Sequence, residues 1–443
     1  MFEEKPYKIF LKYIIPSILG LLAISSASIV DGYFVGNYVG TIGLASVNIT
    51  YPIFSVLFGV GLMFAVGNSV MVSKYLGEGK KEEALNIFSK AMISVTLFSI
   101  LSCIIVYVNI DNIFYLLHLD NELKNSAYIY LSIIVMFLPF IMVGIVIDYF
   151  VRADENPNLS FLALISTSLV NIILDYIFIV KLDYGLAGAA WATGISFSML
   201  IFVLIPHFFS KKATLKFVKP KGSFKIIFTA LKNGASEFIN ESSAGITVLI
   251  FNFMMIKYLG AQGVAAYTIV TYFIMTSIMI SFAISDGLQP IIAKHYGAKN
   301  FKRIKTFLKL GFMTIIGFSS ILIIFVLINP ESLVNIFLDN NNTQTKNITI
   351  DFLKYTWVAF LFVGINILIT SYLTSIHQPL ASASISIARS LFFPIICVTV
   401  LSYYFGIIGV YIALPFSEIF TFFIAIYFFR KNFNQGINKS NTK

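Results

Sequence analysis

The sequence has 443 residues, of which 58% are hydrophobic and 12% are charged, and its formal net charge is +10. A soluble globular protein carries about 25% charged residues, so this composition excludes that class. The Lys and Arg residues lie in short segments between apolar runs, not in a folded basic domain with stacking aromatic residues, which argues against nucleic-acid binding. The sequence therefore predicts an integral membrane protein.

Apolar stretches recur along the whole chain, and each is long enough to cross a hydrocarbon core of about 30 Å as a helix. They lack the alternation of apolar and polar residues that a barrel strand requires, so we expect helices. Hydropathy predicts twelve spans, at residues 13–36, 45–73, 87–109, 127–150, 159–180, 186–209, 233–256, 264–293, 306–328, 352–375, 380–405 and 407–429.

Lys and Arg residues gather on one side of the predicted membrane. If alternate connections lie on the same side as the N-terminus, that side and the adjoining helix ends hold 25 of the 31 Lys and Arg residues, and the other side holds 5. The remaining one, Arg389, lies within a span. Short cytoplasmic loops are rich in Lys and Arg, so we predict a multi-pass cell-membrane protein with both termini in the cytoplasm.

The two halves of the chain repeat a pattern of small residues. The stretches "NYVGTIGLASV" from Asn37 and "KYLGAQGVAAY" from Lys257 match at a displacement of 220 residues. Later, "YGLAGAAWA" from Tyr184 and "FGIIGVYIA" from Phe405 match at a displacement of 221. Glycines that stay in register over such a distance indicate an internal duplication.

The expected fold class is an all-α integral membrane protein with twelve transmembrane helices in two pseudo-symmetric six-helix lobes. Residues 1–209 form the first lobe, residues 210–232 a cytoplasmic loop, and residues 233–443 the second lobe with a short basic tail. Each half has an even number of spans, so the halves are expected to be related by an axis along the membrane normal.

Four polar side chains share one predicted layer of the first lobe. Asp31 and Asp175 each lie six residues before the external end of a span, which is roughly 9 Å of depth at 1.5 Å per residue. Thr193 lies roughly 12 Å from the same surface, and Asn171 is one turn from Asp175 on the same face. Such oxygen-bearing groups suit either Na⁺ or a proton. Alternatively, the two carboxyl groups only make polar contacts between helices.

The second half carries another set of ionisable residues within its spans: Glu237, Glu241, Asp286, Arg389 and Glu418. Glu241 and Arg389 both lie roughly 14 to 15 Å from the cytoplasmic side. We therefore predict an ion pair between them, since a buried Arg without a carboxylate is costly. The alternative is that this set contacts the substrate directly.

Three motifs resemble the multidrug and toxic compound extrusion (MATE) family. They are "VDGYFVGNYVG" in the first span, "RADENPNLSFLALISTSLVNIILDYIFIVKLDYGLAGAAWATGIS" through the fifth and sixth spans, and "LQPIIAKHYGAKN" at the end of the eighth. The resemblance covers the chain from Pro16 to about Tyr427. In pattern the chain is most similar to the DinF-like branch and to small-drug exporters of Gram-positive bacteria.

This resemblance implies a secondary active antiporter that exports amphipathic organic cations or drugs by alternating access. Na⁺ or H⁺ would be the coupling ion, bound by Asp31, Asn171, Asp175 and Thr193, and no other cofactor is expected. Pro16 matches a position at which family members bend the first helix, and a proline there permits a hinge. Some branches use an acidic residue of the tenth span in a second cation site, but "YTWVAFLFVGINILITSYL" has none.

The expected partners are cationic small molecules and the lipid bilayer, with no nucleic acid, and we expect a monomer. An enzyme is not expected, because the four His residues are scattered near span ends and the sequence shows no nucleophile motif or phosphate-binding loop. The alternative function is a lipid-linked oligosaccharide flippase of the same superfamily. Several acids and a single deep base favour a cationic or neutral cargo over that alternative.

Overall fold

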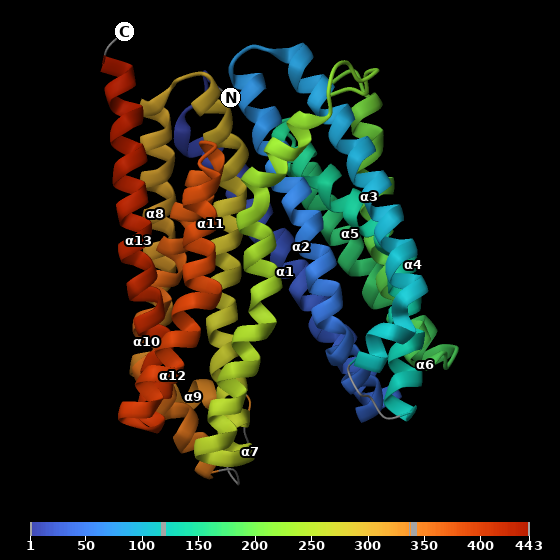
Figure 1. Ribbon diagram of the computed structural model, residues 1–443, viewed down its shortest axis with the longest axis vertical. Helices are drawn as coiled ribbons and strands as arrows, with labels where there is room; N and C mark the ends of the chain where they lie inside the picture. The colour runs from blue at the N-terminus through green and yellow to red at the C-terminus, as the bar shows by residue number, and fades with distance from the viewer. Residues whose placement is uncertain (1, 117–120, 336, 338–342, 442–443) are drawn as a thin grey trace. The chain divides into compact units, whose positions relative to one another are not determined.

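The computed structural model describes residues 2–116, 121–335, 337 and 343–441, and throughout these residues the regular structure is helical (Figure 1). Long apolar runs form helices because, inside a bilayer, every backbone N–H and C=O must find its partner within the segment. The first half contains α1 (Pro6–Phe34), α2 (Thr41–Gly77), α3 (Lys81–Leu116), α4 (Asn121–Ala153), α5 (Pro157–Asp175) and α6 (Gly185–Leu204). The second half contains α7 (Lys225–Gly297), α8 (Phe301–Ile328), α9 (Pro330–Val334), α10 (Thr343–Ser375), α11 (Pro379–Ile387), α12 (Phe393–Phe405) and α13 (Ile407–Asn441).

Short helical turns of other types join some of these helices. Three are π-helical, η1 (Val35–Val39), η2 (Tyr176–Lys181) and η4 (Ala388–Phe392), and one is a 3₁₀ turn, η3 (Ile205–Phe209). Each π turn continues directly from the α-helix before it, so α1, α5 and α11 are extended without a loop.

Among the described residues, eleven helical segments are long and apolar enough to cross a membrane. One of them, α7, has 73 residues, and its backbone leaves the helical region at Gly260, with φ 62° and ψ −151°. An unbroken helix of that length would measure about 110 Å at 1.5 Å per residue, which is far longer than a hydrocarbon core of about 30 Å. The break at Gly260 divides α7 into two segments that are each long enough to span the membrane, so the described residues contain twelve candidate spans, the number that hydropathy predicted.

Gly260 has a counterpart in the first half of the chain. Gly40, 220 residues earlier, also has a positive φ, 93°, and separates η1 from α2. Backbone conformations of this kind are nearly confined to glycine, because a Cβ would crowd the neighbouring carbonyl group. The glycines that match in the sequence thus form the same turn between the first two helices of each half.

The chain divides into two compact units. Unit 1 consists mainly of residues 11–238 and unit 2 mainly of residues 239–443. Unit 1 therefore includes the whole connection between α6 and α7 and the first turns of α7.

Hydrogen bonds explain why that connection belongs to unit 1. The carboxylate of Asp154 accepts the backbone N–H groups of Thr214 and Leu215 at 3.0 to 3.1 Å, and its Oδ2 lies 2.7 Å from His207 Nε2. The side chain of Leu215 is fully buried. The segment is therefore fastened to the end of α4 by a buried carboxylate.

Two further contacts continue this attachment. Asn86 on α3 exchanges two hydrogen bonds with the backbone of Lys221, at 2.8 and 3.0 Å. The first turns of α7 then approach α2 so closely that a Cβ on Gly234 would lie 2.2 Å from the carbonyl oxygen of Met63. Only a glycine permits this backbone contact.

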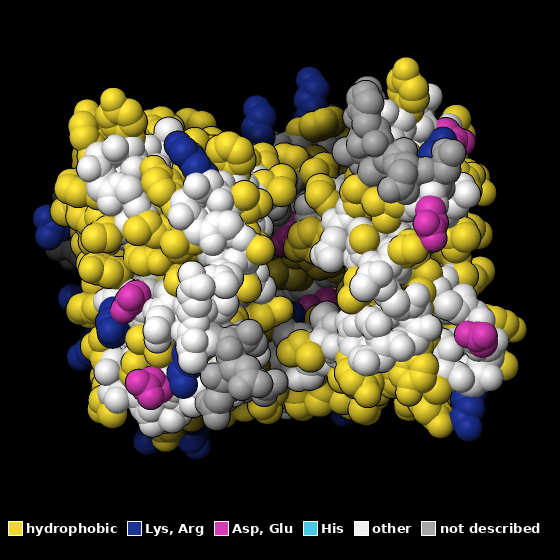
Figure 2. Space-filling view, turned by 90° about the horizontal axis from the view of Figure 1, so that it is seen from below, with side chains coloured by type: hydrophobic (Ala, Val, Ile, Leu, Met, Phe, Trp, Pro, Cys, Tyr) yellow, Lys and Arg dark blue, Asp and Glu magenta, His cyan; other side chains and the backbone are white. Residues whose placement is uncertain are grey.

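Apolar side chains also cover much of the outer surface. α3 exposes Leu101, Ile104, Ile105 and Val108, and α8 exposes Ile321, Ile324, Phe325 and Ile328. In Figure 2, which looks at one end of the molecule, hydrophobic side chains lie along much of the outer rim. Apolar surface of this extent is typical of contact with lipid.

Candidate functional site

Unit 1 contains a cavity of about 200 Å³ among α1, α2, α4, α5 and α6. Three of the four predicted cation ligands, Asp31, Asn171 and Thr193, line it. The other polar residues of the lining are Ser28, Thr50, Tyr51, Tyr130, Thr167, Ser168 and Ser196. A pocket for a drug-sized molecule usually measures about 300 to 1,000 Å³, whereas a water molecule needs about 30 Å³. The cavity therefore fits an ion with a few waters better than an organic molecule.

Asp175, the fourth predicted ligand, is the last residue of α5 and lies one turn beyond Asn171. It is fully buried, and neither of its carboxylate oxygens has a hydrogen-bond partner among the described residues. The same holds for Oδ1 of Asp31. The two carboxyl groups are also close enough for the charge of one to act on the other.

This pair of carboxyl groups has an electrostatic consequence. An ionised carboxylate that is buried without a donor or a counter-charge loses several kcal/mol of solvation that nothing restores. Two such groups side by side also repel each other. Neutralisation by a proton or a monovalent cation removes both costs, and the oxygen atoms of Asn171 and Thr193 are suitable further ligands for a hard cation.

The π turns set the local geometry around both acids. η2 begins directly after Asp175, and η1 begins four residues after Asp31. A π turn contains one extra residue, and such insertions are frequent at functional sites. One extra residue rotates everything beyond it by about 100° relative to an unbroken helix. Simple helical periodicity therefore cannot predict which residues beyond each acid face the cavity.

Sequence reasoning did not identify the other seven polar residues of the cavity, of which Thr167 and Tyr130 lie near the two acids. Thr167 lies on α5 one turn before Asn171 and two turns before Asp175, so the spacing of eight residues on one face was a visible signal. Its hydroxyl is buried and has no partner among the residues described. Tyr130 on α4 lies within electrostatic range of both acids, and no spacing in the sequence pointed to it.

The predicted ion pair between Arg389 and Glu241 is wrong. Arg389 Nε instead donates a hydrogen bond to Glu418 Oε1 at 3.2 Å, and both side chains are buried. Asn366 Nδ2 donates to Glu418 Oε2 at 2.8 Å and to the backbone carbonyl of the same residue at 2.9 Å. The depth of a residue in a span gives its height but not its direction around the helix. Arg389 lies in the π turn η4, and packing against α13 decided its partner.

The other three predicted ionisable residues of the second half are divided between the two units. Glu237 is buried and belongs to unit 1, whereas Glu241 and Asp286 belong to unit 2 and are half-buried. Pro16 lies inside α1, where it has no N–H to donate to the carbonyl of Lys12. Its role as a hinge stays a prediction.

Repeated membrane-spanning helices, two units with the same helix turns and a polar cavity inside an apolar body are features of multi-pass membrane transporters built from internal repeats. The chain belongs to the MATE family. The family model, MatE, matches residues 16–177 and again residues 245–399. Two matches to the same model also agree with the duplication found in the sequence.

Relatives of known name extend over almost the whole chain. The multidrug export protein MepA of Staphylococcus haemolyticus (strain JCSC1435) is 28% identical over 433 residues, which cover 96% of this chain and 94% of the relative. The protein of the same name from Staphylococcus aureus (strain MSSA476) is 24% identical over 423 residues, covering 94% and 92%.

Solved structures show the same fold. A crystal structure of MATE in complex with MaL6 has a TM-score of 0.92 at 20% identity, covering 98% of both chains. The outward-facing conformation of a multidrug resistance MATE family transporter of the MOP superfamily has a TM-score of 0.92, covering 98% of this chain and 97% of the other. The predicted fold class and the predicted family are confirmed.

Proposed function

We propose that this chain exports amphipathic organic cations in exchange for Na⁺ or H⁺ by alternating access. The observation that carries the proposal is the pair of acids in unit 1: Asp31 lines the cavity, Asp175 lies one turn beyond the cavity residue Asn171, and Oδ1 of Asp31 and both oxygens of Asp175 are buried without partners among the described residues. The names of the MepA relatives, multidrug export proteins, support the substrate class. Solved MATE structures in a bent and in a straight conformation, with TM-scores of 0.91 and 0.90, support a change of conformation.

In this proposal Asp31 and Asp175 bind the coupling ion together with Asn171 and Thr193. Binding of a proton or Na⁺ removes the repulsion between the two carboxylates and stabilises the closed arrangement of α1, α5 and α6 around the cavity. Release of the ion restores the repulsion and favours the other conformation. An ion shifts this equilibrium only by the difference between its affinities for the two states.

The helix α1 is suited to transmit this change. It carries Asp31 near one end and Pro16 in its interior. Because proline lacks a backbone N–H, the helix has one hydrogen bond fewer at Pro16 and can bend there when Asp31 moves. In this proposal ion occupancy therefore controls the bend of α1.

The polarity of the cavity separates this proposal from the flippase alternative. Its lining contains one charged residue, Asp31, and no Lys or Arg. The structure of a MOP superfamily transporter from Pyrococcus furiosus has a TM-score of 0.91 with this chain, and the reverse polarity of that transporter's binding pocket suggests a different function for it. A negative site repels anionic lipid-linked cargo and attracts cations, so the polarity here favours export of cations.

The proposal also concerns which residues contact the exported substrate and on which side of the membrane the termini lie. Glu241 and Asp286 are candidates for substrate contact, whereas Arg389 and Glu418 neutralise each other. Cytoplasmic termini and a monomeric state remain predictions from the sequence.

Transport in proteoliposomes tests the proposal. Purified protein is reconstituted, and export of an ethidium-like dye is followed under a Na⁺ gradient and under a pH gradient separately. We expect gradient-driven transport by the parent under at least one gradient, and its loss in Asp31→Asn and in Asp175→Asn. Asp111→Asn makes the same chemical change at a side chain that is 72% exposed and should transport as the parent does.

Two results would contradict the proposal. One is the absence of gradient-driven transport by the parent for a broad panel of cationic dyes. The other is full transport by both Asn variants, which would mean that the two carboxyl groups are structural.

A further inference from the structure

We propose that unit 2 retains the counterpart of the unit 1 cavity as a packed apolar core, and that this packing confines coupling-ion binding to unit 1. The inference rests on the proposed function, because it concerns the number of ion sites in an ion-coupled transporter. It follows from a residue-by-residue comparison of the two units, each taken by itself.

The backbone fixes the register of that comparison. Residues with positive φ recur at matching places: Gly40 and Gly260 at a displacement of 220, Glu155 and His377 at 222, and Gly185 and Gly406 at 221. α5 and α11 begin with Pro157 and Pro379, and the residues before them share an unusual conformation, φ −119° and ψ 60° against φ −110° and ψ 67°. Because these are features of the backbone, the register does not depend on matching the identities of apolar residues.

The exposed fractions of side chains confirm the register around Asp31, in the part of the first half that precedes the π turn η1. Around Asp31, Ile29 and Tyr33 are 75% and 59% exposed, and Leu249 and Phe253, at a displacement of 220, are 67% and 64% exposed. Val35 and its counterpart Met255 are both buried. The lipid-facing residues of α3 and α8 match at the same displacement.

The register assigns an apolar counterpart to each of the four predicted ligands and to the cavity residue Tyr130. At displacements of 220 to 222, Phe251 corresponds to Asp31, Phe352 to Tyr130, Phe393 to Asn171, Cys397 to Asp175, and Leu414 to Thr193. η4 precedes Cys397 and can shift the match by one residue, in which case Val398 replaces it and Pro394 replaces Phe393. In either case no side-chain oxygen remains.

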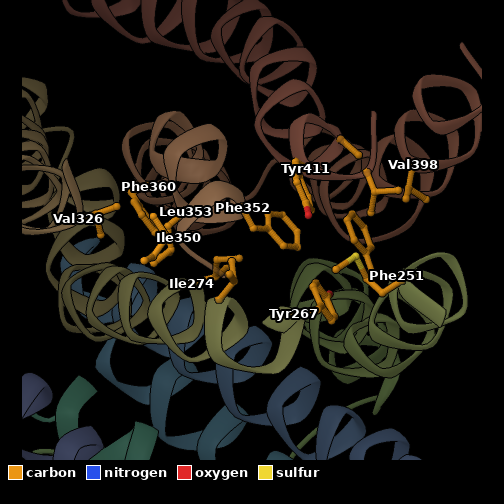
Figure 3. Close-up of a cluster of buried hydrophobic side chains, with 14 of the residues drawn as sticks. Phe251, Tyr267, Ile274, Val326, Ile350, Phe352, Leu353, Phe360, Val398 and Tyr411 are labelled. Carbon is orange, nitrogen blue, oxygen red and sulfur yellow. The ribbon is translucent and has the colours of Figure 1, made fainter. Parts of the chain in front are cut away.

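All five counterparts belong to one cluster of unit 2. Phe251, Phe352 and Cys397 are among its buried members, and Phe393 and Leu414 pack against it. Figure 3 shows Phe251, Phe352 and Val398 in this cluster, together with Tyr267 and Tyr411. Four of these places line the cavity in unit 1 and the fifth is Asp175, whereas in unit 2 all five belong to or pack against a single hydrophobic core.

Aromatic rings fill this core. The ring of Phe251 stacks on that of Tyr267 at 5.4 Å between centroids, Tyr267 stacks on Phe352 at 6.0 Å, and Phe352 stacks on Tyr411 at 4.5 Å. A cation placed here would lose its water shell and gain no carboxylate, amide or hydroxyl from the five positions. Of the two equivalent places that the duplicated fold supplies, the one in unit 1 has carboxylate, amide and hydroxyl groups at these positions, and the one in unit 2 has none at the corresponding described positions.

Ion flux in proteoliposomes tests this inference. Substrate-driven movement of protons is measured with a trapped pH dye, and that of sodium with ²²Na⁺, for the parent and for the double variant Asp31→Asn/Asp175→Asn. We expect the double variant to lose all ion flux above protein-free liposomes. Gradient-independent exchange of the dye by the same variant shows that it is folded.

Two substitutions in unit 2 give the complementary test. Phe251→Leu and Cys397→Ala change the core without adding or removing a charge. We expect a lower unfolding temperature and an unchanged ratio of ions to substrate. Asp111→Asn serves as the control for loss of a carboxylate.

The outcomes separate the inference from the proposed function. An ion-to-substrate ratio altered by Phe251→Leu overturns the inference while ion-coupled export stands. Ion flux retained by a folded double variant overturns the inference together with the assignment of the coupling ion to Asp31 and Asp175. No ion flux in the parent overturns the proposed function, and the inference falls with it.

Discussion

Asp175 and Glu418 are both buried acids within spans, and their surroundings differ. Glu418 accepts hydrogen bonds from Arg389 and Asn366, so its charge is compensated. Asp175 has no partner for either oxygen among the described residues. A compensated acid is typical of a structural ion pair, and an uncompensated one of a site that exchanges a proton or cation. Surroundings, not residue type, therefore distinguish the two roles.

This contrast predicts opposite effects on stability. Glu418→Gln leaves Arg389 buried without a counter-charge and should destabilise the protein by about 3 to 5 kcal/mol. Asp175→Asn removes a carboxylate without partners and should be neutral or stabilising. Thermal unfolding in detergent measures both effects, with Asp351→Asn, whose side chain is 58% exposed, as the control. A lower unfolding temperature for Asp175→Asn than for Glu418→Gln would contradict the assignment.

At the level of the elements, breaks and π turns position the polar residues. η2 follows Asp175 directly, η4 contains Arg389, and Gly260 separates the two spans of α7. Each interruption changes the direction of the following residues relative to a regular helix. Asp175 and Arg389, two of the buried ionisable side chains, thus lie where helical regularity is interrupted.

The break in α7 gives a prediction with an internal control. Gly260 has φ 62° and ψ −151°, so Gly260→Ala should destabilise the protein by about 1 to 3 kcal/mol. Gly245 lies in the same helix with helical geometry and has nothing within 4 Å of an added Cβ. Gly245→Ala should therefore be neutral or stabilise by up to about 1 kcal/mol.

Unfolding temperatures of the two alanine variants, purified side by side, decide the matter. If Gly260→Ala is as stable as Gly245→Ala, the turn does not require glycine. The assignment of two spans to α7 would then need another physical basis.

At the level of the whole molecule, the boundary between the units lies within a helix. Unit 1 extends to Phe238, past the connection that follows α6 and into α7. The segment around Thr214 and Leu215 is held by Asp154, and the first turns of α7 contact α2. The connection is therefore an attached part of unit 1, and we propose that any movement between the two lobes takes place beyond it.

Proteolysis tests this attachment. Asp154→Ala removes the acceptor of two backbone hydrogen bonds, each worth about 1.5 to 3 kcal/mol when the acceptor is charged. The segment from 210 to 225 carries six Lys residues, at which trypsin can cleave. Since 1.4 kcal/mol corresponds to a factor of ten, loss of even one of these hydrogen bonds should make cleavage at least about tenfold faster in the variant. The rate is measured by a gel time course, with Asp111→Asn as the control. Equal cleavage rates in the parent and in Asp154→Ala would show that the carboxylate does not hold the segment.

The sequence by itself determined the membrane class, the twelve crossings, the duplication and the acids within spans. These follow from composition and local periodicity, because the bilayer requires an apolar helix of minimum length at every crossing regardless of its neighbours. The expected depth of Asp31, Asn171 and Thr193 also came from counting residues along single helices. The three residues line one cavity.

Only the tertiary structure decided the direction of side chains and the partners they reach. Arg389 pairs with Glu418 and not with Glu241, Tyr130 enters the cavity from α4, and the counterpart of Asp31 in unit 2 lies in an aromatic core. Each of these depends on contacts between helices far apart in the chain and on π turns that rotate residues out of the regular pattern. Hydropathy measures transfer from water into lipid, one residue at a time, and contains no information about which helix packs against which.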